Sequence, residues 1–242
     1  MFEPTRDHLD YAFAWGHHCV PCESCGVIAG GEFFPVKNLI DDRPDAFLMD
    51  PVEYARISSE RRIEAIVHSH LLSPPAASEQ DRVACENLGL PFLIVSLATG
   101  THTVIEPTGY RAPLIGRQWG YGTHDCWSLV RDALRDYGGI ETPDFSRNQW
   151  QWWQKGEDLI VERWKAAGFH CIQQGSQPQH LDVFGMQIQA PVVNHLGIFL
   201  APDMILHQMQ DKLSTREIYG GVYQKATVLH LRHERMIDAA GN

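Results

Sequence analysis

Two groups of residues with catalytic chemistry follow one another along this chain, each confined to its own half. The first group combines a carboxylate, a His-x-His pair and a Ser-x-x-Asp pair: Glu23, His68, His70, Ser78 and Asp81. The second combines a thiol with two later histidines: Cys126, His195 and His207. A chain of 242 residues has room for one large core or two small ones. Because the two groups are separate, we expect two domains. The residue types of each group are those that hydrolyse peptide bonds, so we expect both domains to do so.

The acidic charge of the chain is concentrated in its first half. The net charge is −10, and residues 1–105 contain 7 Lys and Arg against 15 Asp and Glu, whereas residues 106–242 contain 13 against 15. Neither half is basic, so nucleic acid is not an expected partner. No apolar run reaches the length of a membrane span, and residues 1–22 lack the basic and then apolar pattern of a secretory signal. We therefore expect no membrane span, no export signal and free thiols at the six cysteines.

The first half has the pattern of a compact α/β domain over residues 1–106. Helices are expected at 5–18 with Thr5 as N-cap, at 51–57 with Asp50 as cap, and at 78–88 with Ser78 as cap. Strands are expected at 23–29, 33–40, 63–67, 92–97 and 101–105, with His68 just beyond the end of the third. Residues 107–122 are rich in Gly, Pro and Arg without a clear period, which predicts a linker.

The second half, residues 123–242, has an α+β pattern in which a helix precedes a small sheet. Helical spacing is found at 126–137, ended by two glycines, and helix is also expected across 144–168. Strand-like runs follow at 182–188, 196–200 and 204–207. This order is papain-like.

Three residues of the first half form a set suited to a metal ion. His68 and His70 are two residues apart near a strand, so their side chains share one side of the chain. With the Asp81 carboxylate they make three protein ligands and leave a fourth position for water, as in catalytic zinc sites. Glu23 is the candidate base for that water, and the Ser78 hydroxyl is a candidate stabiliser of the oxyanion.

The same residues match the motif of the JAMM metallopeptidases, also called MPN domains. A glutamate precedes His-x-His, and seven residues then separate that pair from Ser-x-x-Asp. The first half resembles this family over about residues 5–106, with Leu71 where the family often has proline. The resemblance implies Zn²⁺ and hydrolysis of a peptide or isopeptide bond. MPN domains can also be scaffolds, and a His-x-His pair alone is commonly structural, so turnover is left open.

The thiol of the second half lies where a helix is expected to begin. A helix N-terminus stabilises a thiolate, and its free N–H groups can form an oxyanion hole. His195 opens an apolar strand and is the candidate base for Cys126, while His207 ends the next strand and is the candidate group that orients His195. Gly197 leaves room beside the base. The alternative for a single Cys is a buried structural thiol.

These residues resemble the motifs of the NlpC-type cysteine peptidases. The matching segments are Tyr121, Asp125-Cys126, His195-Leu196-Gly197-Ile198 and Leu206-His207. The resemblance implies hydrolysis of peptidoglycan stem peptides, commonly at the D-γ-glutamyl–diaminopimelate bond. Trp127 stands where the family usually has a small residue, which predicts a narrower cleft beside the nucleophile.

Two other features have plain interpretations. Cys19, Cys22 and Cys25 form a C-x2-C-x2-C run, but no second ligand pair at zinc-finger spacing accompanies it, so free thiols are the preferred interpretation. The tryptophans at 150–164 favour packing over a glycan-binding platform.

The tandem order of an MPN domain and an NlpC-type domain resembles the tail tip assembly proteins of lambda-like bacteriophages. That resemblance implies a protein made in the host cytoplasm and built into or onto a tail tip. It further implies action on the periplasmic cell wall, with stem peptides and other tail tip proteins as partners. Two alternatives stay open: a non-catalytic tail assembly or scaffold factor, and a cytoplasmic bacterial isopeptidase.

Overall fold

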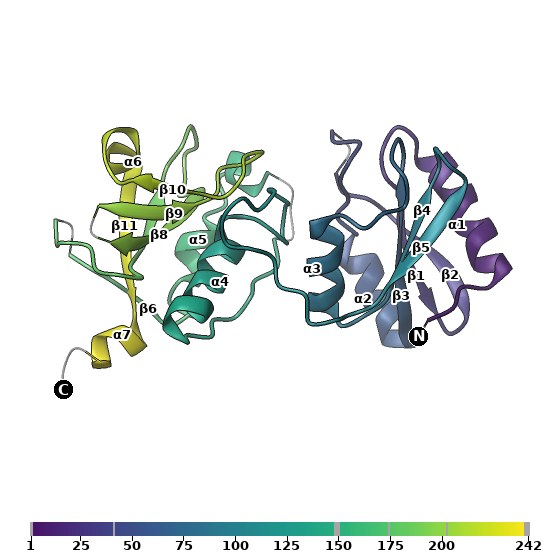
Figure 1. The fold of residues 1–242 in the computed structure, drawn as a ribbon, viewed down its shortest axis with the longest axis horizontal. Helices are drawn as coiled ribbons and strands as arrows, with labels where there is room; N and C mark the ends of the chain where they lie inside the picture. The colour runs from purple at the N-terminus through teal and green to yellow at the C-terminus, as the bar shows by residue number, and fades with distance from the viewer. Residues whose placement is uncertain (1, 41, 148–150, 174, 202, 240–242) are drawn as a thin grey trace. The chain divides into compact units, whose positions relative to one another are not determined.

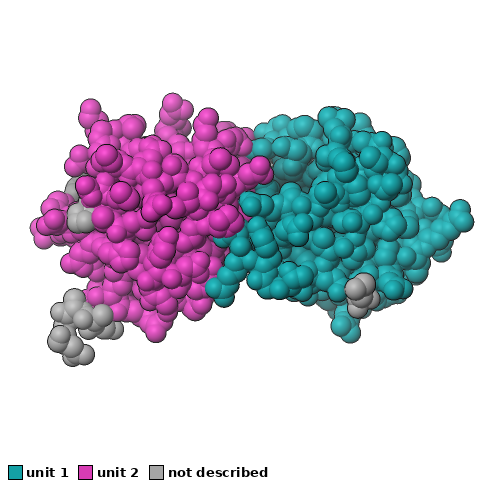
Figure 2. All heavy atoms as spheres, viewed as in Figure 1, with its two compact units in different colours: residues 1–112 teal, residues 113–242 magenta. Residues whose placement is uncertain are grey.

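A computed structural model describes residues 2–40, 42–147, 151–173, 175–201 and 203–239 (Figure 1). The chain divides into two compact units, residues 1–112 and 113–242, coloured separately in Figure 2. Each unit has apolar core clusters of its own. Among the described residues, no helix has both the length and the apolar character that a membrane crossing needs.

Unit 1 is a five-stranded sheet covered by helices on both faces (Figure 1). The strand order is β2 (Glu32–Val36), β1 (Cys25–Ala29), β3 (Ile63–His70), β4 (Phe92–Ser96) and β5 (Thr101–Ile105), with only the β3–β4 pair parallel. Helix α1 (Arg6–Cys19) packs Ala12 against Ala65 and Val67 on one face. Helices α2 (Pro51–Glu60) and α3 (Glu79–Leu88) pack against the other face, where Ile66 lies. The expected α/β architecture of residues 1–106 agrees with this arrangement.

Strand β3 differs from its expected length in a way that matters for the site. It was expected to end at residue 67, with His68 outside it, but it continues to His70. The extra residues are held on both sides, because His68 pairs with Cys25 of β1 and with Ile94 of β4. The side chains of a strand alternate between faces, so His68 and His70 share the face of Ile66, beneath α2 and α3.

Unit 2 packs one long helix against a six-stranded antiparallel sheet. The strand order is β10 (Thr215–Ile218), β9 (Met204–His207), β8 (His195–Ala201), β7 (Val183–Met186), β11 (Thr227–His233) and β6 (Phe169–Cys171). Helix α4 (Cys126–Gly138) buries Leu129 and Ala133 against Leu196 and Ile198 of β8. Helices α6 (Gly221–Ala226) and α7 (Glu234–Ala239) flank β11 in the sequence.

Unit 2 differs from expectation in one helical segment and in three strands that were not predicted. Helix was expected across 144–168, but the described part of that segment contains only the 3-10 turn η1 (Trp152–Lys155) and α5 (Leu159–Arg163). Gly156, with φ 79°, ends the turn, and the Asp158 side chain caps α5, so the segment is divided by its own local signals. The strands β6, β10 and β11 were not expected.

The linker expected at 107–122 is also shorter than the sequence indicated. The boundary between the units falls after Ala112, and residues 113–122 belong to unit 2. Arg117 explains why, because its side chain is fully buried and its Nη1 lies 2.8 Å from Asp132 Oδ2 on α4. The Arg117 amide also donates to the Ser214 hydroxyl at 2.9 Å. The Gly, Pro and Arg content of this segment predicted a linker, whereas the Arg117 side chain is buried and paired with Asp132.

Candidate functional sites

The residues expected to bind a metal in unit 1 come together on the face of its sheet that α2 and α3 cover. Nε2 of His68 lies 3.2 Å from Asp81 Oδ1, Nε2 of His70 lies 3.6 Å from Asp81 Oδ2, and the two Nε2 atoms are 3.3 Å apart. Four ligands placed tetrahedrally at usual zinc distances are separated from one another by about 3.3 Å. All three side chains are buried. The donor set and its spacing therefore fit a zinc ion.

Hydrogen bonds around these three residues orient their ligand atoms. His70 Nδ1 lies 2.9 Å from the Pro74 carbonyl, so Nδ1 carries a proton, and Nε2, which faces Asp81, is the nitrogen that would bind a metal ion. Burial alone lowers the pKa of His70, but the contacts with Asp81 and Pro74 raise it to about 8. Burial alone would raise the pKa of Asp81, but His68, His70 and the Ser78 amide hold it far below its usual range.

Ser78 is engaged with Asp81 in a reciprocal capping box at the start of α3. The Ser78 amide and hydroxyl both donate to Asp81 Oδ2 at 2.8 Å, and the Asp81 amide donates back to the hydroxyl at 3.1 Å. Oδ1 is left facing His68. The hydroxyl proton is thus directed to Asp81, and a role for Ser78 at an oxyanion stays a prediction.

Glu23 precedes β1 and is only 8% exposed. Burial raises the pKa of its carboxyl to about 7, and the neighbouring His68 and His70 moderate the rise. A carboxyl with a pKa near neutrality can both accept and return a proton at physiological pH. The position and pKa of Glu23 suit the general base that the sequence predicted.

In unit 2, Cys126 is the first residue of α4, as the sequence predicted. Asp125 caps the helix by accepting from the Ser128 amide at 2.9 Å, so Cys126 lies in the first turn, where backbone amides lack partners within the helix. Burial raises the pKa of the Cys126 thiol to about 12, and amides of Leu196 and Trp127 counteract part of that rise. The resting thiol is therefore neutral and needs a base to become a nucleophile.

His195 and His207 form the pair that the sequence predicted. His195 begins β8, His207 ends β9, and His195 Nε2 lies 3.1 Å from His207 Nδ1. A Cβ added at Gly197, opposite His207 in the sheet, would lie 3.0 Å from the His207 Cβ and 2.3 Å from the Phe184 ring. Only glycine leaves room for this arrangement. Burial and the nearby His207 lower the pKa of His195 to about 3.

Cys126 and His195 line one cavity of about 360 Å³. The sequence did not predict the composition of its wall, which is strongly aromatic and includes Trp119, Tyr121, Trp127, Phe145, Trp152, Trp153, Trp164 and Phe169. Three of these come from the tryptophan-rich segment that was expected only to pack. Trp150, the fourth of that segment, lies outside the described residues. The cavity thus has a thiol and an imidazole in a largely aromatic wall.

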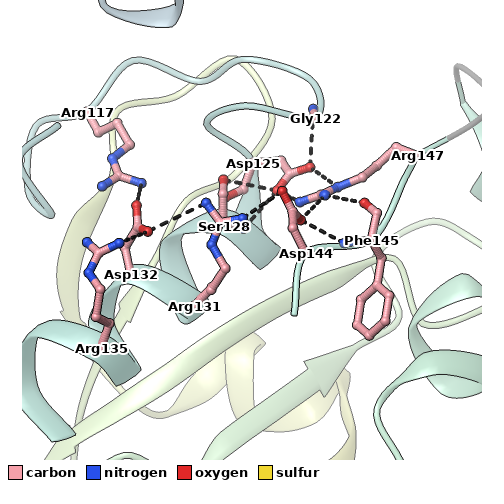
Figure 3. Close-up of polar contacts among 10 residues, drawn as sticks. All are labelled: Arg117, Gly122, Asp125, Ser128, Arg131, Asp132, Arg135, Asp144, Phe145 and Arg147. Atoms are coloured by element: carbon pink, nitrogen blue, oxygen red, sulfur yellow. Dashed lines mark hydrogen bonds and ion pairs between the residues drawn. The ribbon is translucent and has the colours of Figure 1, made fainter. Parts of the chain in front are cut away.

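A second feature absent from the predictions is the ion pair that holds the nucleophile turn (Figure 3). Arg147 donates through Nε to Asp125 Oδ2 at 2.8 Å and through Nη2 to Oδ1 at 2.9 Å, while its Nη1 contacts Asp144 and the Phe145 carbonyl. The Gly122 amide also donates to Asp125. Arg147 thereby ties the loop carrying Phe145, a cavity residue, to the start of α4. No short sequence motif identifies it, because it lies 22 residues after Asp125.

Comparison with known proteins identifies the class of unit 2 first. Residues 116–232 match the NlpC/P60 family, so the chain contains an NlpC/P60 domain, and the predicted resemblance of the second half is confirmed.

The whole chain then matches two phage proteins. It is 35% identical to the Tail tip assembly protein K of Escherichia phage N15 over 228 residues, which cover 92% of this chain and 91% of that protein. It is 32% identical to the Tail tip assembly protein K of Escherichia phage lambda over 185 residues, which cover 76% of this chain and 89% of that protein. The chain therefore belongs to the tail tip assembly protein K family. A solution structure of a Desulfitobacterium hafniense protein matches 41% of this chain and 78% of its own at 25% identity, with a TM-score of 0.36.

Proposed function

We propose that this chain is a phage tail tip assembly protein whose second unit is a cysteine endopeptidase for peptidoglycan stem peptides. The observation that carries the proposal is that Cys126 and His195 lie in the wall of one cavity. His207 forms a hydrogen bond with His195. Membership of the NlpC/P60 family and of the tail tip assembly protein K family supports the substrate class and the setting.

The reaction follows from the protonation states of the pair. His195 takes the proton of the Cys126 thiol, and the thiolate attacks the amide carbon of the substrate. We assign stabilisation of the oxyanion to the amides at the start of α4. The C–N bond breaks as His195 returns the proton to the leaving amine, which leaves a thioester on Cys126. Water, deprotonated by His195, then hydrolyses the thioester and restores the thiol.

For unit 1 we propose a JAMM-type zinc site on an MPN-like domain. His68, His70 and Asp81 would hold the ion, and their mutual spacing supports this assignment. Bound zinc supplies a water of lowered pKa and a Lewis acid for a carbonyl oxygen. Glu23 would be the proton carrier of this site, holding a proton on its carboxylate and delivering it to the leaving amine of a peptide or isopeptide bond.

The setting proposed is a tail protein made in the host cytoplasm, assembled with other tail tip proteins and acting at the periplasmic wall. The relatives' names support assembly with a tail tip. The strongly acidic first half suits docking to another tail protein better than binding to the anionic wall. These names also favour a second candidate function, in which the chain acts mainly as an assembly factor.

Mass spectrometry of purified muropeptides tests the proposed activity. Wild-type protein, freshly reduced, and His68→Ala should both cut the stem peptides, whereas Cys126→Ala should not, and the products identify the bond. An intact muropeptide pool after incubation with wild-type protein would refute the peptidase function. Complementation of tail assembly by Cys126→Ala and by His68→Ala then separates a catalytic role from a purely structural one.

A further inference from the structure

The proton arrangement of the His195–His207 pair depends on a residue that no motif includes. His207 Nδ1 faces His195, so its second nitrogen, Nε2, is directed elsewhere. That nitrogen is fully buried and has no hydrogen-bond partner among the described residues. A carboxylate oxygen of Glu217 lies 3.7 Å from it, within ion-pair distance. A small movement of either side chain would therefore bring the buried nitrogen and the carboxylate within hydrogen-bond distance.

The sheet places Glu217 on the correct face for this contact. His207 on β9 pairs with Thr215 on β10, so Glu217, two residues further on, lies diagonally opposite on the same face. The His207 side chain is 1% exposed and that of Glu217 is 40% exposed, so the carboxylate connects a buried imidazole to the surface. Tyr223 of α6 fixes the carboxylate, because its hydroxyl donates to Glu217 Oε2 at 2.5 Å and its ring packs against that of His207.

The hydrogen bonds between Glu217, His207 and His195 determine which ring nitrogens carry protons. An ionised carboxylate only accepts hydrogen bonds, so His207 Nε2 must carry the proton that faces Glu217. His207 Nδ1 then has a lone pair and accepts from His195 Nε2–H. The remaining nitrogen of His195, Nδ1, is left unprotonated. That is the state in which His195 can take the proton of the Cys126 thiol.

We propose that Glu217 is a positioning residue of the site, which sets the tautomer of His207 and through it that of His195. The expected effect of Glu217 on kcat rests on the proposed peptidase function. Its expected effect on the tautomer of His207 does not. When His195 gains the Cys126 proton, the cation forms in a buried environment. The Glu217 carboxylate stabilises it from the far end of the His207 ring.

Nitrogen-15 NMR of the histidine rings tests the proposal without any substrate. In wild-type protein, both His195 and His207 should carry their proton on Nε2. In Glu217→Ala, His207 should become a mixture of tautomers, whereas Glu217→Gln should retain the wild-type pattern because its amide oxygen still accepts. Glu141→Gln, at an exposed position of the same unit, is the matched control. A proton on Nδ1 of His207 in the wild type, or an unchanged pattern in Glu217→Ala, overturns the proposal.

Kinetics on stem peptides supply the second readout. Glu217→Ala should lower kcat about tenfold with little change in KM, because the residue acts through the base and not on the substrate. Glu217→Gln should recover part of that loss, because its amide oxygen still sets the tautomer of His207 although it lacks the negative charge; a purely structural role would not require this intermediate value. Wild-type kcat in Glu217→Ala contradicts the proposal. If the wild type cleaves nothing, the peptidase function fails, and the NMR experiment still decides the role of Glu217.

Discussion

Asp81 uses its two carboxylate oxygens for different tasks. Oδ2 accepts two hydrogen bonds from Ser78, while Oδ1 faces His68. The capping box thus fixes the carboxylate before any ligand arrives, which lowers the entropy lost on metal binding. A side chain that is held in the capping box of a helix and faces two imidazoles is well suited to hold an ion.

Zinc binding by unit 1 is the first prediction. The protein should bind about one zinc ion per chain, lost on treatment with a chelator. His68→Ala should weaken the affinity about 100-fold or more, because one of three ligand atoms is removed. Titration calorimetry of the metal-free protein measures this, with His102→Ala, exposed on β5, as control. Equal affinities of wild type and His68→Ala would count against the site.

Arg147 gives the second prediction. Its side chain and that of Asp125 are 10% and 11% exposed, so Arg147→Ala leaves a buried carboxylate without its bidentate partner. We expect a loss of about 3 kcal/mol in the unfolding free energy. Arg147→Lys should recover only part of it, because an ammonium lacks the fork of donors. Urea unfolding followed by tryptophan fluorescence measures the effect, and Arg216→Ala, exposed on β10, should change little. A loss no greater than that of this control would show the pair to be dispensable.

The eight site residues could be predicted because they belong to short motifs that resemble those of two known families, but Arg147 and Glu217 belong to no such motif. Both act across the fold: Arg147 reaches back to the helix cap, and Glu217 reaches a strand neighbour through sheet register. Neither contact has a spacing rule that a single sequence reveals. Whether the eight residues perform the chemistry assigned to them is still a prediction.

At the level of elements, strands with an apolar face and helices with a clear cap were predicted well. Thr5, Asp50 and Ser78 each cap the helix that follows, as the sequence predicted. The failures were elements whose form depends on partners distant in sequence. The short strand β6 pairs with β11, more than fifty residues later, and β10 is recognisable only once β9 lies beside it.

The pairing of β8 with β9 supplies the third prediction. In Gly197→Ala the new methyl group would meet the Phe184 ring at 2.3 Å and His207 at 3.0 Å. Repacking should cost about 1–3 kcal/mol of unfolding free energy and move His207, with a marked fall in kcat. The control is Gly220→Ala, where an added methyl group has no atom within 4 Å. Full activity in the Gly197 variant would mean that the space beside His207 is not needed.

At the level of the whole molecule, each core cluster is built from residues of a single unit. Fragments 1–112 and 113–242 should therefore fold independently, the first binding zinc and the second cutting stem peptides. A fragment 123–242, cut at the expected end of the linker, should be unstable because Asp132 loses the buried Arg117. Circular dichroism and thermal unfolding of the three fragments test this. A stable fragment 123–242 would contradict the structural role of Arg117.

The position of β11 has a consequence for biosynthesis. This strand comes late in the chain, yet it lies inside the sheet between β7 and β6 and contributes Leu231 to the wall of the thiol cavity. While residues 227–233 are still within the ribosome, the edges of β7 and β6 are unpaired and the cavity lacks part of its wall. A chain shortened before residue 227 thus keeps Cys126 but lacks part of the wall of the cavity. We therefore expect the proposed peptidase activity only after β11 has been synthesised and has paired with β7.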